Sequence, residues 1–159
     1  MSAEDHELLM SVLAKKPQRI LEVGVSAGGT TKLLLENMGP EATLVSVDLA
    51  RQYYRDQTKE VGFIAEFFFK NDKRWTKLLG RDISFVIDNF IEPFDFVVLD
   101  TAHILPGEVL SFLVILPYMA DGSVMQIHRL PRCRCVRGRP GSHHAESLLF
   151  FTMAFKRRL

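Results

Sequence analysis

The chain has 159 residues, 47% of them hydrophobic and 25% charged, which is the composition of a globular protein with one domain over residues 1–159. No stretch reaches the roughly 20 apolar residues of a membrane span, so no membrane-spanning helix is expected. The net charge of +1 conceals an asymmetry: residues 1–128 carry 12 Lys/Arg and 18 Asp/Glu, whereas residues 129–159 carry 8 and 1. The segment 129–159 is therefore predicted to be a basic tail that is organised differently from the body.

The N-terminal segment, residues 1–16, is predicted to be a helix. Its sequence, MSAEDHELLMSVLAKK, is acidic and then amphipathic, unlike a signal peptide. Cys133 and Cys135 are separated by one residue, too close for an ordinary disulfide framework. Both features favour a reducing, cytoplasmic setting.

Strands and helices alternate along the rest of the body. Strands are expected at Arg19–Val25, Thr43–Val47, Arg74–Leu79, Phe94–Asp100 and Ser123–His128. Helices are expected at Thr30–Met38, Gln52–Glu60, Asp82–Phe90 and in the apolar segment after Pro106, which is predicted to be well buried because it is apolar almost all round. The strand at Phe94–Asp100 is apolar on both faces, as in a sheet covered on both sides. The pattern predicts an α/β fold with a doubly wound, mainly parallel sheet.

A glycine turn lies within Ile20–Thr31, ILEVGVSAGGTT, between the first sheet strand and the next helix. Ligands of such sheets bind outside the carboxyl ends of the strands. A turn without Cβ atoms lets backbone N–H groups and a helix N-terminus approach a polar ligand, so Gly24 is expected to tolerate no side chain. Asp48 ends the second strand, where a carboxylate can accept hydrogen bonds from both hydroxyls of a ribose. Together these features indicate a nucleoside-containing cofactor.

Two cofactor classes fit this turn to different degrees. The dinucleotide pattern G-x-G-x-x-G falls on Gly24, Ser26 and Gly29, and the S-adenosylmethionine pattern E/D-x-G-x-G-x-G falls on Glu22, Gly24, Ser26 and Gly28. Serine replaces the middle glycine in both. Glu22 favours S-adenosylmethionine, because a carboxylate would repel a pyrophosphate and attract a sulfonium and an ammonium. The alternative for Glu22 is a residue that only caps the turn.

Four ordered segments resemble the motifs of class I S-adenosylmethionine-dependent methyltransferases, most closely the family-24, small-molecule O-methyltransferase-like branch. They are KPQRILEVGVSAGGTT, LVSVDL, FDFVVLDTAH and LPYMADGSVMQIH, between Lys16 and His128. The resemblance implies a Rossmann-like sheet of order 3-2-1-4-5, usually completed by an antiparallel hairpin. No such hairpin is evident after His128, so it is expected to be reduced or missing, and residues 129–159 form a divergent tail.

The resemblance also implies a set of cofactor-binding residues. The glycine turn would pass beneath the methionine part of S-adenosylmethionine, and Asp48 would hold the ribose. Gly80 and Asp82 fall where the family contacts adenine, although an ordinary turn explains them equally well. The full set is Glu22, Gly24, Ser26, Gly28, Asp48, Gly80 and Asp82.

The catalytic candidates implied by the resemblance are Asp100, His103 and His128. Asp100 would face the site of methyl transfer, with a helix cap as its alternative. Either histidine could be the general base, since neutral imidazole suits that task near pH 7, or could simply hydrogen-bond the neighbouring loops. Arg129 stands where relatives carry an acid, so no metal is expected.

The tail offers no further site. Cys133, Cys135, His143 and His144 do not have a common zinc-ligand spacing. The arginines between 129 and 139 could contact phosphate or an acidic partner, but a solvated basic loop is the preferred interpretation.

The sequence therefore predicts an S-adenosylmethionine-dependent methyltransferase that acts on an oxygen of a small-molecule acceptor. The alternative is a binding or interaction module that keeps the cofactor fold without methyl-transfer activity. A nucleotide-dependent oxidoreductase is disfavoured by Glu22 and Ser26. No membrane or nucleic-acid partner is expected, and homo-oligomerisation is left open.

Overall fold

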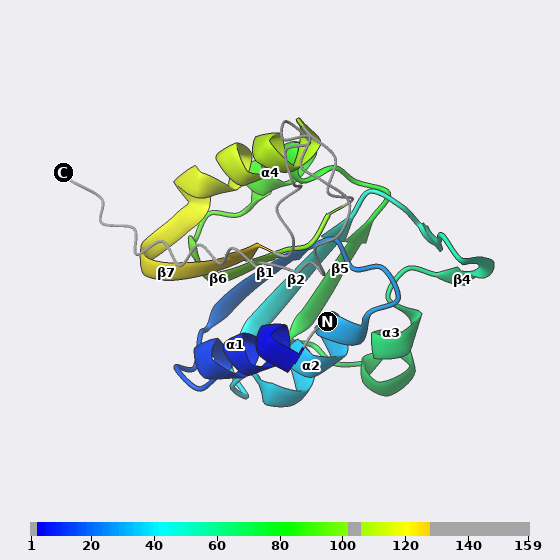
Figure 1. Cartoon of the computed structure of the whole chain (residues 1–159), viewed down its shortest axis with the longest axis horizontal. Coiled ribbons are helices and arrows are strands. Elements are labelled where there is room, and N and C mark those ends of the chain that lie inside the picture. The colour runs from blue at the N-terminus through cyan, green and yellow to red at the C-terminus, as the bar shows by residue number, and fades with distance from the viewer. Residues whose placement is uncertain (1–2, 102–105, 128–159) are drawn as a thin grey trace, which may run out of the picture.

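The computed structural model describes residues 3–101 and 106–127, which form a parallel five-stranded sheet with helices on both faces (Figure 1). The strand order β5-β2-β1-β6-β7, taken along the chain without a small separate hairpin, is the predicted order 3-2-1-4-5. The Rossmann-like doubly wound fold is therefore confirmed. The strands are β1 Arg19–Val23, β2 Thr43–Asp48, β5 Trp75–Leu79, β6 Phe94–Leu99 and β7 Met119–Ile127. The prediction that the final antiparallel hairpin is reduced or missing concerns residues after His128, which lie outside the described residues.

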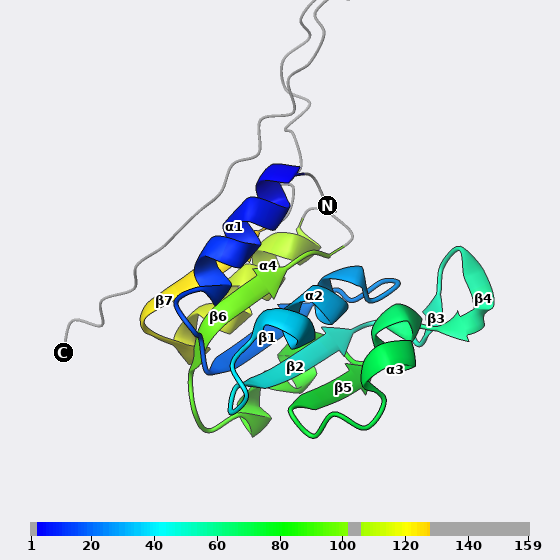
Figure 2. The same cartoon turned by 90° about the horizontal axis from the view of Figure 1, so that it is seen from below.

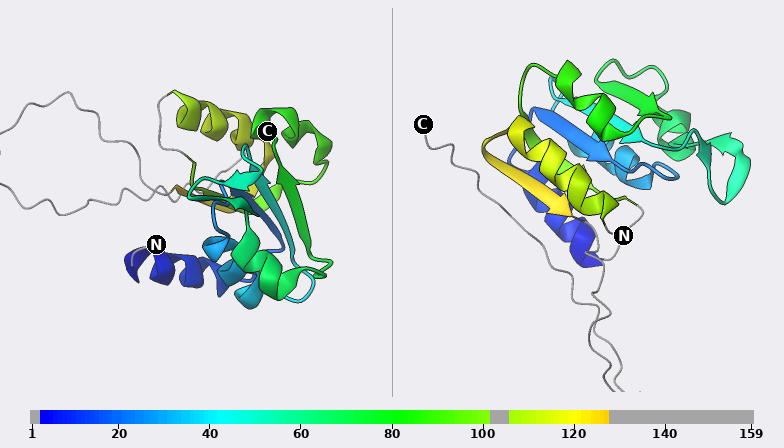
Figure 3. Two further views of the ribbon diagram at one scale, coloured as in Figure 1. Left: turned by 90° about the vertical axis from the view of Figure 1, so that its right-hand side faces the viewer. Right: turned by 90° about the horizontal axis from the view of Figure 1, so that it is seen from above.

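The helices divide between the two faces of the sheet. One face is covered by α1, α2 and α3, and the other by α4 together with short 3-10 turns (Figures 1 and 3). Each face of the sheet has its own apolar core, because successive residues of a strand point to opposite sides. Leu21, Val97 and Met125 belong to the core on the α4 side, and Ile20 and Phe96 to the core on the α1 side. The helices are α1 Ala3–Leu13, α2 Gly29–Asn37, α3 Phe63–Phe69 and α4 Gly107–Ile115.

The segment Gln52–Glu60 is not the predicted helix. It forms an antiparallel hairpin of β3 Gln52–Tyr53 and β4 Asp56–Glu60, which projects beyond α3 (Figure 2). A helix there would have no apolar stripe to bury, and all of β4 except the half-buried Asp56 is exposed. The hairpin instead packs Tyr53 on Phe63, with ring centroids 5.4 Å apart. The contact joins the hairpin to the short helix α3, which begins at Phe63 and was not predicted from the sequence.

Two further predictions on the α4 side need correction. The segment Asp82–Phe90 forms two 3-10 turns, Ile83–Phe85 and Ile87–Asn89, in place of one short helix. The helix after Pro106 is not buried all round, because α4 packs on the sheet with one side only. Its apolar residues on the outer side are about half exposed, at 43% for Val109, 56% for Leu110 and 53% for Leu113.

At Gly24 the chain leaving β1 lies close against the chain leaving β6. Its φ is +91°, and a Cβ at this position would collide with the backbone carbonyl of Asp100. Backbone hydrogen bonds hold both sides of the contact, from Gly24 N to Val47 O and from Asp100 N to Val23 O, each 2.9 Å long. The fold itself therefore requires glycine here, independently of any ligand.

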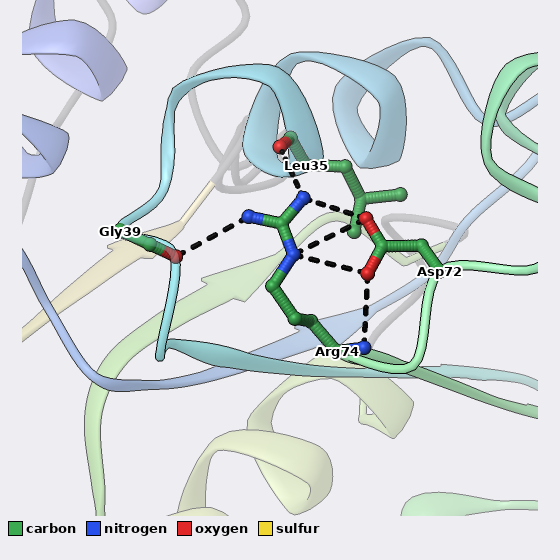
Figure 4. Close-up of polar contacts among 4 residues, drawn as sticks. All are labelled: Leu35, Gly39, Asp72 and Arg74. Atoms are coloured by element: carbon green, nitrogen blue, oxygen red, sulfur yellow. Dashed lines mark hydrogen bonds and ion pairs between the residues drawn. The ribbon is translucent and has the colours of Figure 1, made fainter.

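A partly buried ion pair connects the start of β5 to the end of α2 (Figure 4). The Arg74 guanidinium donates to both carboxylate oxygens of Asp72 and to the carbonyls of Leu35, at 3.2 Å, and Gly39, at 3.3 Å. These carbonyls lie in and just after the last turn of α2, where backbone acceptors lack helical partners. The hydrogen bonds from Arg74 also lower the pKa of Asp72. The pair therefore fixes α2 against the sheet.

We expect Gly24→Ala to lower the free energy of unfolding by about 3 kcal/mol or more, because left-handed geometry and an immovable backbone neighbour both oppose a Cβ. Gly29→Ala is the matched control: Gly29 begins α2, and a Cβ added there would have nothing within 4 Å. That change should be neutral or stabilise by up to about 1 kcal/mol. Urea denaturation of both variants measures the difference, and equal losses would contradict the close approach.

We expect Asp72→Asn to cost about 2 kcal/mol of unfolding free energy, since hydrogen bonds to charged groups are worth more than neutral ones. Glu36→Gln, which removes the carboxylate of the Lys32–Glu36 pair on the surface of α2, should cost less than about 0.5 kcal/mol. Because the pKa of Asp72 lies below that of the unfolded chain, its contribution should be lost as pH falls through the lowered pKa. A difference between wild type and Asp72→Asn that persists unchanged in acid would contradict this.

Candidate functional site

The predicted cofactor residues that follow strands gather at one edge of the sheet. The glycine turn follows β1, Asp48 ends β2, Asp82 follows β5 and Asp100 follows β6. Because these strands are parallel, their carboxyl ends meet at the same edge. His103 and His128 lie outside the described residues, so only the cofactor half of the predicted site and Asp100 can be described.

The side chain of Asp48 holds the glycine turn by accepting hydrogen bonds from the backbone of the turn. Its Oδ2 accepts the N–H groups of Val25, at 2.8 Å, and Ser26, at 3.2 Å. Its Oδ1 accepts the N–H of Ala50 at 2.8 Å. Ser26 is left-handed, with φ 53°, so the turn presents successive N–H groups to one carboxylate. Since a carboxylate oxygen has about two lone-pair sites, Oδ1 keeps room for one further donor and Oδ2 is saturated.

The other side of the turn rests on the N-terminus of α3. Gly62 N donates to Ser26 O at 2.8 Å, and Ile64 N donates to Ala27 O at 3.0 Å. A Cβ on Gly28 would come within 2.8 Å of Gly62 Cα, so two glycines allow these backbones to meet. Gly62 is not among the site residues that were predicted from the sequence.

Glu22 is fully buried at the base of the turn. Its Oε2 accepts hydrogen bonds from Thr31 Oγ1, at 2.8 Å, and Ser46 Oγ, at 2.7 Å. Ser46 Oγ in turn accepts Trp75 Nε1 at 3.0 Å, so one chain of hydrogen bonds connects β5, β2, β1 and α2. The other carboxyl oxygen, Oε1, has no hydrogen-bond partner within the described residues.

Burial changes the charge of Glu22. It raises the pKa from 4.5 to about 7, against the opposing effect of the Ser46 and Thr31 hydroxyls, and the charges of Asp100 and Asp48 add to the rise. The carboxyl is therefore about half protonated at pH 7. Below pH 4.5 the carboxyl is protonated in both the folded and the unfolded protein. As pH rises to about 7 the unfolded chain loses this proton first, so the free energy of unfolding falls by roughly 3 kcal/mol in total. At neutral pH burial therefore leaves Glu22 with less than the full negative charge that was expected from the sequence.

Gly80 and Asp82 have structural uses in their own turn. Asp82 Oδ1 accepts Ser84 N at 2.9 Å and Ser84 Oγ at 2.7 Å, and so caps a 3-10 turn. Gly80 has φ 69°, and a Cβ there would come within 2.7 Å of Arg51 Nε. These contacts support the ordinary-turn interpretation, and adenine binding by these residues stays a prediction.

Ser46 and Thr31, which hydrogen-bond Glu22, and Trp75, which hydrogen-bonds Ser46, were not predicted from the sequence. The register of the sheet indicates that Ser46 belongs to this site, because Ser46 on β2 is the direct partner of Glu22 on β1. A lone serine in the otherwise apolar run LVSV, beside a buried glutamate, is therefore a candidate hydrogen-bond donor.

The described residues hold no group of three or more His, Cys, Asp or Glu side chains that could bind a metal ion. Since His103, His128 and Arg129 lie outside them, the expectation that no metal is used is not tested. Within the same ranges, no helix is long and apolar enough to cross a bilayer.

Several solved structures share this fold. TomG from Streptomyces achromogenes, an O-methyltransferase involved in tomaymycin synthesis and solved with S-adenosylmethionine, has 24% identity and a TM-score of 0.63, with 80% of this chain and 56% of that chain covered. The O-methyltransferase from Bacillus cereus, solved with S-adenosylhomocysteine, has 21% identity, a TM-score of 0.63 and the same coverage, 80% and 56%. The S-adenosylhomocysteine-bound methyltransferase PaMTH1 from Podospora anserina has 16% identity, a TM-score of 0.59 and coverage of 80% and 53%. At these identities the likeness establishes the fold, and the chain spans little more than half the length of each structure.

No curated protein sequence matches the chain. A sequence profile of the family described as "Methyltransferase domain" does match, over residues 21–129, which is more than half of the chain. The matched range begins within β1 and includes the glycine turn, Asp48 and Asp100, the residues that meet at the carboxyl edge of the sheet. The chain belongs to the methyltransferase domain family.

Proposed function

We propose that the protein transfers a methyl group from S-adenosylmethionine to an oxygen of a small-molecule acceptor. The observation that carries this proposal is the glycine turn, held between Asp48 and the N-terminus of α3 at the carboxyl edge of the sheet. Membership of the methyltransferase domain family supports it. Structures of the same fold that were solved with S-adenosylmethionine or S-adenosylhomocysteine support it further.

The residues at this edge fit such a cofactor. Asp48 Oδ1 can accept one ribose hydroxyl while Asp48 Oδ2 keeps the turn in place. That is one hydroxyl fewer than the sequence predicted for this carboxylate. Glu22 supplies partial negative charge beneath the turn for the cationic methionine part, and Gly24, Ser26 and Gly28 provide the turn itself. When bound, S-adenosylmethionine supplies an electrophilic methyl group on its sulfonium.

The acceptor half of the site is assigned to Asp100, His103 and His128. The task of these residues is to align the acceptor oxygen for in-line displacement and to take its proton. Asp100 follows β6 beside the glycine turn, as that task requires. The involvement of TomG in tomaymycin synthesis supports a small natural product as the acceptor class.

The direct test is calorimetry with S-adenosylmethionine, S-adenosylhomocysteine and NAD, followed by turnover against a panel of hydroxylated acceptors. Binding of the first two and release of S-adenosylhomocysteine with an acceptor are expected. Binding without turnover on any acceptor would favour the interaction module, and binding of NAD alone would overturn the proposal.

We further propose that residues 1–159 act as one domain with a divergent basic tail at 129–159, in the cytoplasm. The close spacing of Cys133 and Cys135, too short for an ordinary disulfide framework, supports that location. Fractionation of cells that express the tagged chain tests it.

Asp48→Asn should weaken S-adenosylhomocysteine binding by about 2 kcal/mol, because the ribose loses a charged acceptor and the turn loses part of its support. Analogues that lack the 2′- or 3′-hydroxyl separate the two causes. If Asp48 holds a hydroxyl, wild type should bind one of these analogues more weakly than S-adenosylhomocysteine. In Asp48→Asn, removal of the same hydroxyl should then cost little affinity. Equal losses in both proteins would mean that Asp48 acts only through the turn.

Methyl transfer should survive exhaustive EDTA treatment, because Arg129 stands where relatives carry an acidic residue and Mg²⁺ prefers several oxygen ligands. Activity is measured after EDTA and after Mg²⁺, Mn²⁺ or Zn²⁺ is added back, with Arg129→Asp in parallel. Loss with EDTA and recovery with Mg²⁺ in wild type would contradict the prediction. Mg²⁺ dependence that appears only in Arg129→Asp would support it.

A further inference from the structure

Glu22 is a titratable group in a place where its charge matters. It lies two residues before Gly24, is fully buried, and has one carboxyl oxygen that no described residue hydrogen-bonds. A buried polar atom without a partner costs free energy, and an ionised one costs more. The site therefore favours a neutral carboxyl as long as no positive charge is near.

Within residues 3–101 and 106–127, the groups that shift the pKa of Glu22 are either neutral or negative. Ser46 on β2 and Thr31 on α2 donate hydroxyl hydrogen bonds to it. The charges that raise its pKa are those of Asp100, after β6, and Asp48, at the end of β2. The negative charges of Asp100 and Asp48 thus lie near enough to Glu22 to disfavour its ionisation. Cations placed there would reverse the balance at Glu22.

We propose that Glu22 is a positioning residue that releases its proton when S-adenosylmethionine binds, so that cofactor affinity depends on pH through this buried carboxyl. The inference rests on the proposed function. The proton leaves the Glu22 carboxyl for the solvent, no covalent bond to the cofactor forms, and no electron is transferred. The resulting carboxylate faces the sulfonium and ammonium of the ligand across a medium of low dielectric constant, where their attraction is strong.

The direction in which S-adenosylmethionine affinity changes with pH follows from the protonation of Glu22 in the protein without cofactor. Above pH 8 Glu22 is already ionised, and binding requires no proton release. At pH 6 it is protonated, and binding must remove that proton. The dissociation constant of S-adenosylmethionine should therefore rise about tenfold between pH 8 and pH 6.

Isothermal titration calorimetry in buffers of different ionisation enthalpy measures the proton directly. At pH 6.5 we expect release of about 0.7 proton per S-adenosylmethionine bound to wild type. S-adenosylhomocysteine lacks the sulfonium charge and should release less. In Glu22→Gln the release and the tenfold pH dependence should disappear. Glu92→Gln is the control, because Glu92 lies on the exposed surface and pairs with Arg19, away from this edge.

Two further measurements do not depend on Glu22→Gln being well folded. Thr31→Val removes a hydroxyl that favours the ionised carboxyl, so the pH of maximal release should move upward. Carbon-13 NMR of protein labelled at glutamate should contain one carboxyl resonance that titrates near pH 7 and shifts to a lower midpoint with S-adenosylmethionine.

The outcomes separate this inference from the function on which it rests. If S-adenosylmethionine does not bind, the proposed function and the inference both fail. Binding with heats that do not depend on the buffer would overturn the inference alone. Equal proton release in wild type and Glu22→Gln would also overturn it, because the proton would come from another group.

Discussion

The carboxylate of Asp48 determines the shape of the ligand-facing edge. It accepts backbone N–H groups from Val25 and Ser26 and so bends the chain just after β1, while Ala50 orients the carboxylate from the other side. Without this anchor the left-handed conformation of Ser26 would be unfavourable, because a non-glycine residue there needs compensation. β1, β2, α2 and α3 meet at this turn, which the Asp48 side chain holds on one side and the N-terminus of α3 holds on the other.

A second constraint lies beneath that turn. Glu22 connects β1 to β2 and α2 through hydroxyl groups, and Trp75 extends the connection to β5. A leucine there would avoid the cost of burying a carboxyl, which burial makes large enough to raise the pKa to about 7. Retaining an acid therefore lowers stability near neutral pH in exchange for negative charge where a cationic ligand is proposed to bind, a trade-off found at many functional sites.

Local patterns predicted the central sheet well and its surroundings poorly. Four of the five strands end at or just before a glycine or an acid, at Gly24, Asp48, Gly80 and Asp100, and such local signals do not depend on distant residues. The hairpin at Gln52–Glu60 was mistaken for a helix, since its conformation depends on the packing of Tyr53 against Phe63. The outer side of α4 was expected to be buried, because hydropathy reports an apolar helix without reporting how many neighbours cover it.

The sequence by itself determined the doubly wound fold, the position of the glycine turn and the acid that ends β2, because each is encoded in a few consecutive residues. Only the tertiary structure decided what these residues do. Gly24 is required by the backbone of Asp100, and Gly28 by that of Gly62. Glu22 owes its partial charge to burial and to partners on other elements. Such properties depend on which distant residues face one another across the sheet. Parallel strands are joined by long crossovers, so these residues come together only when the whole domain folds.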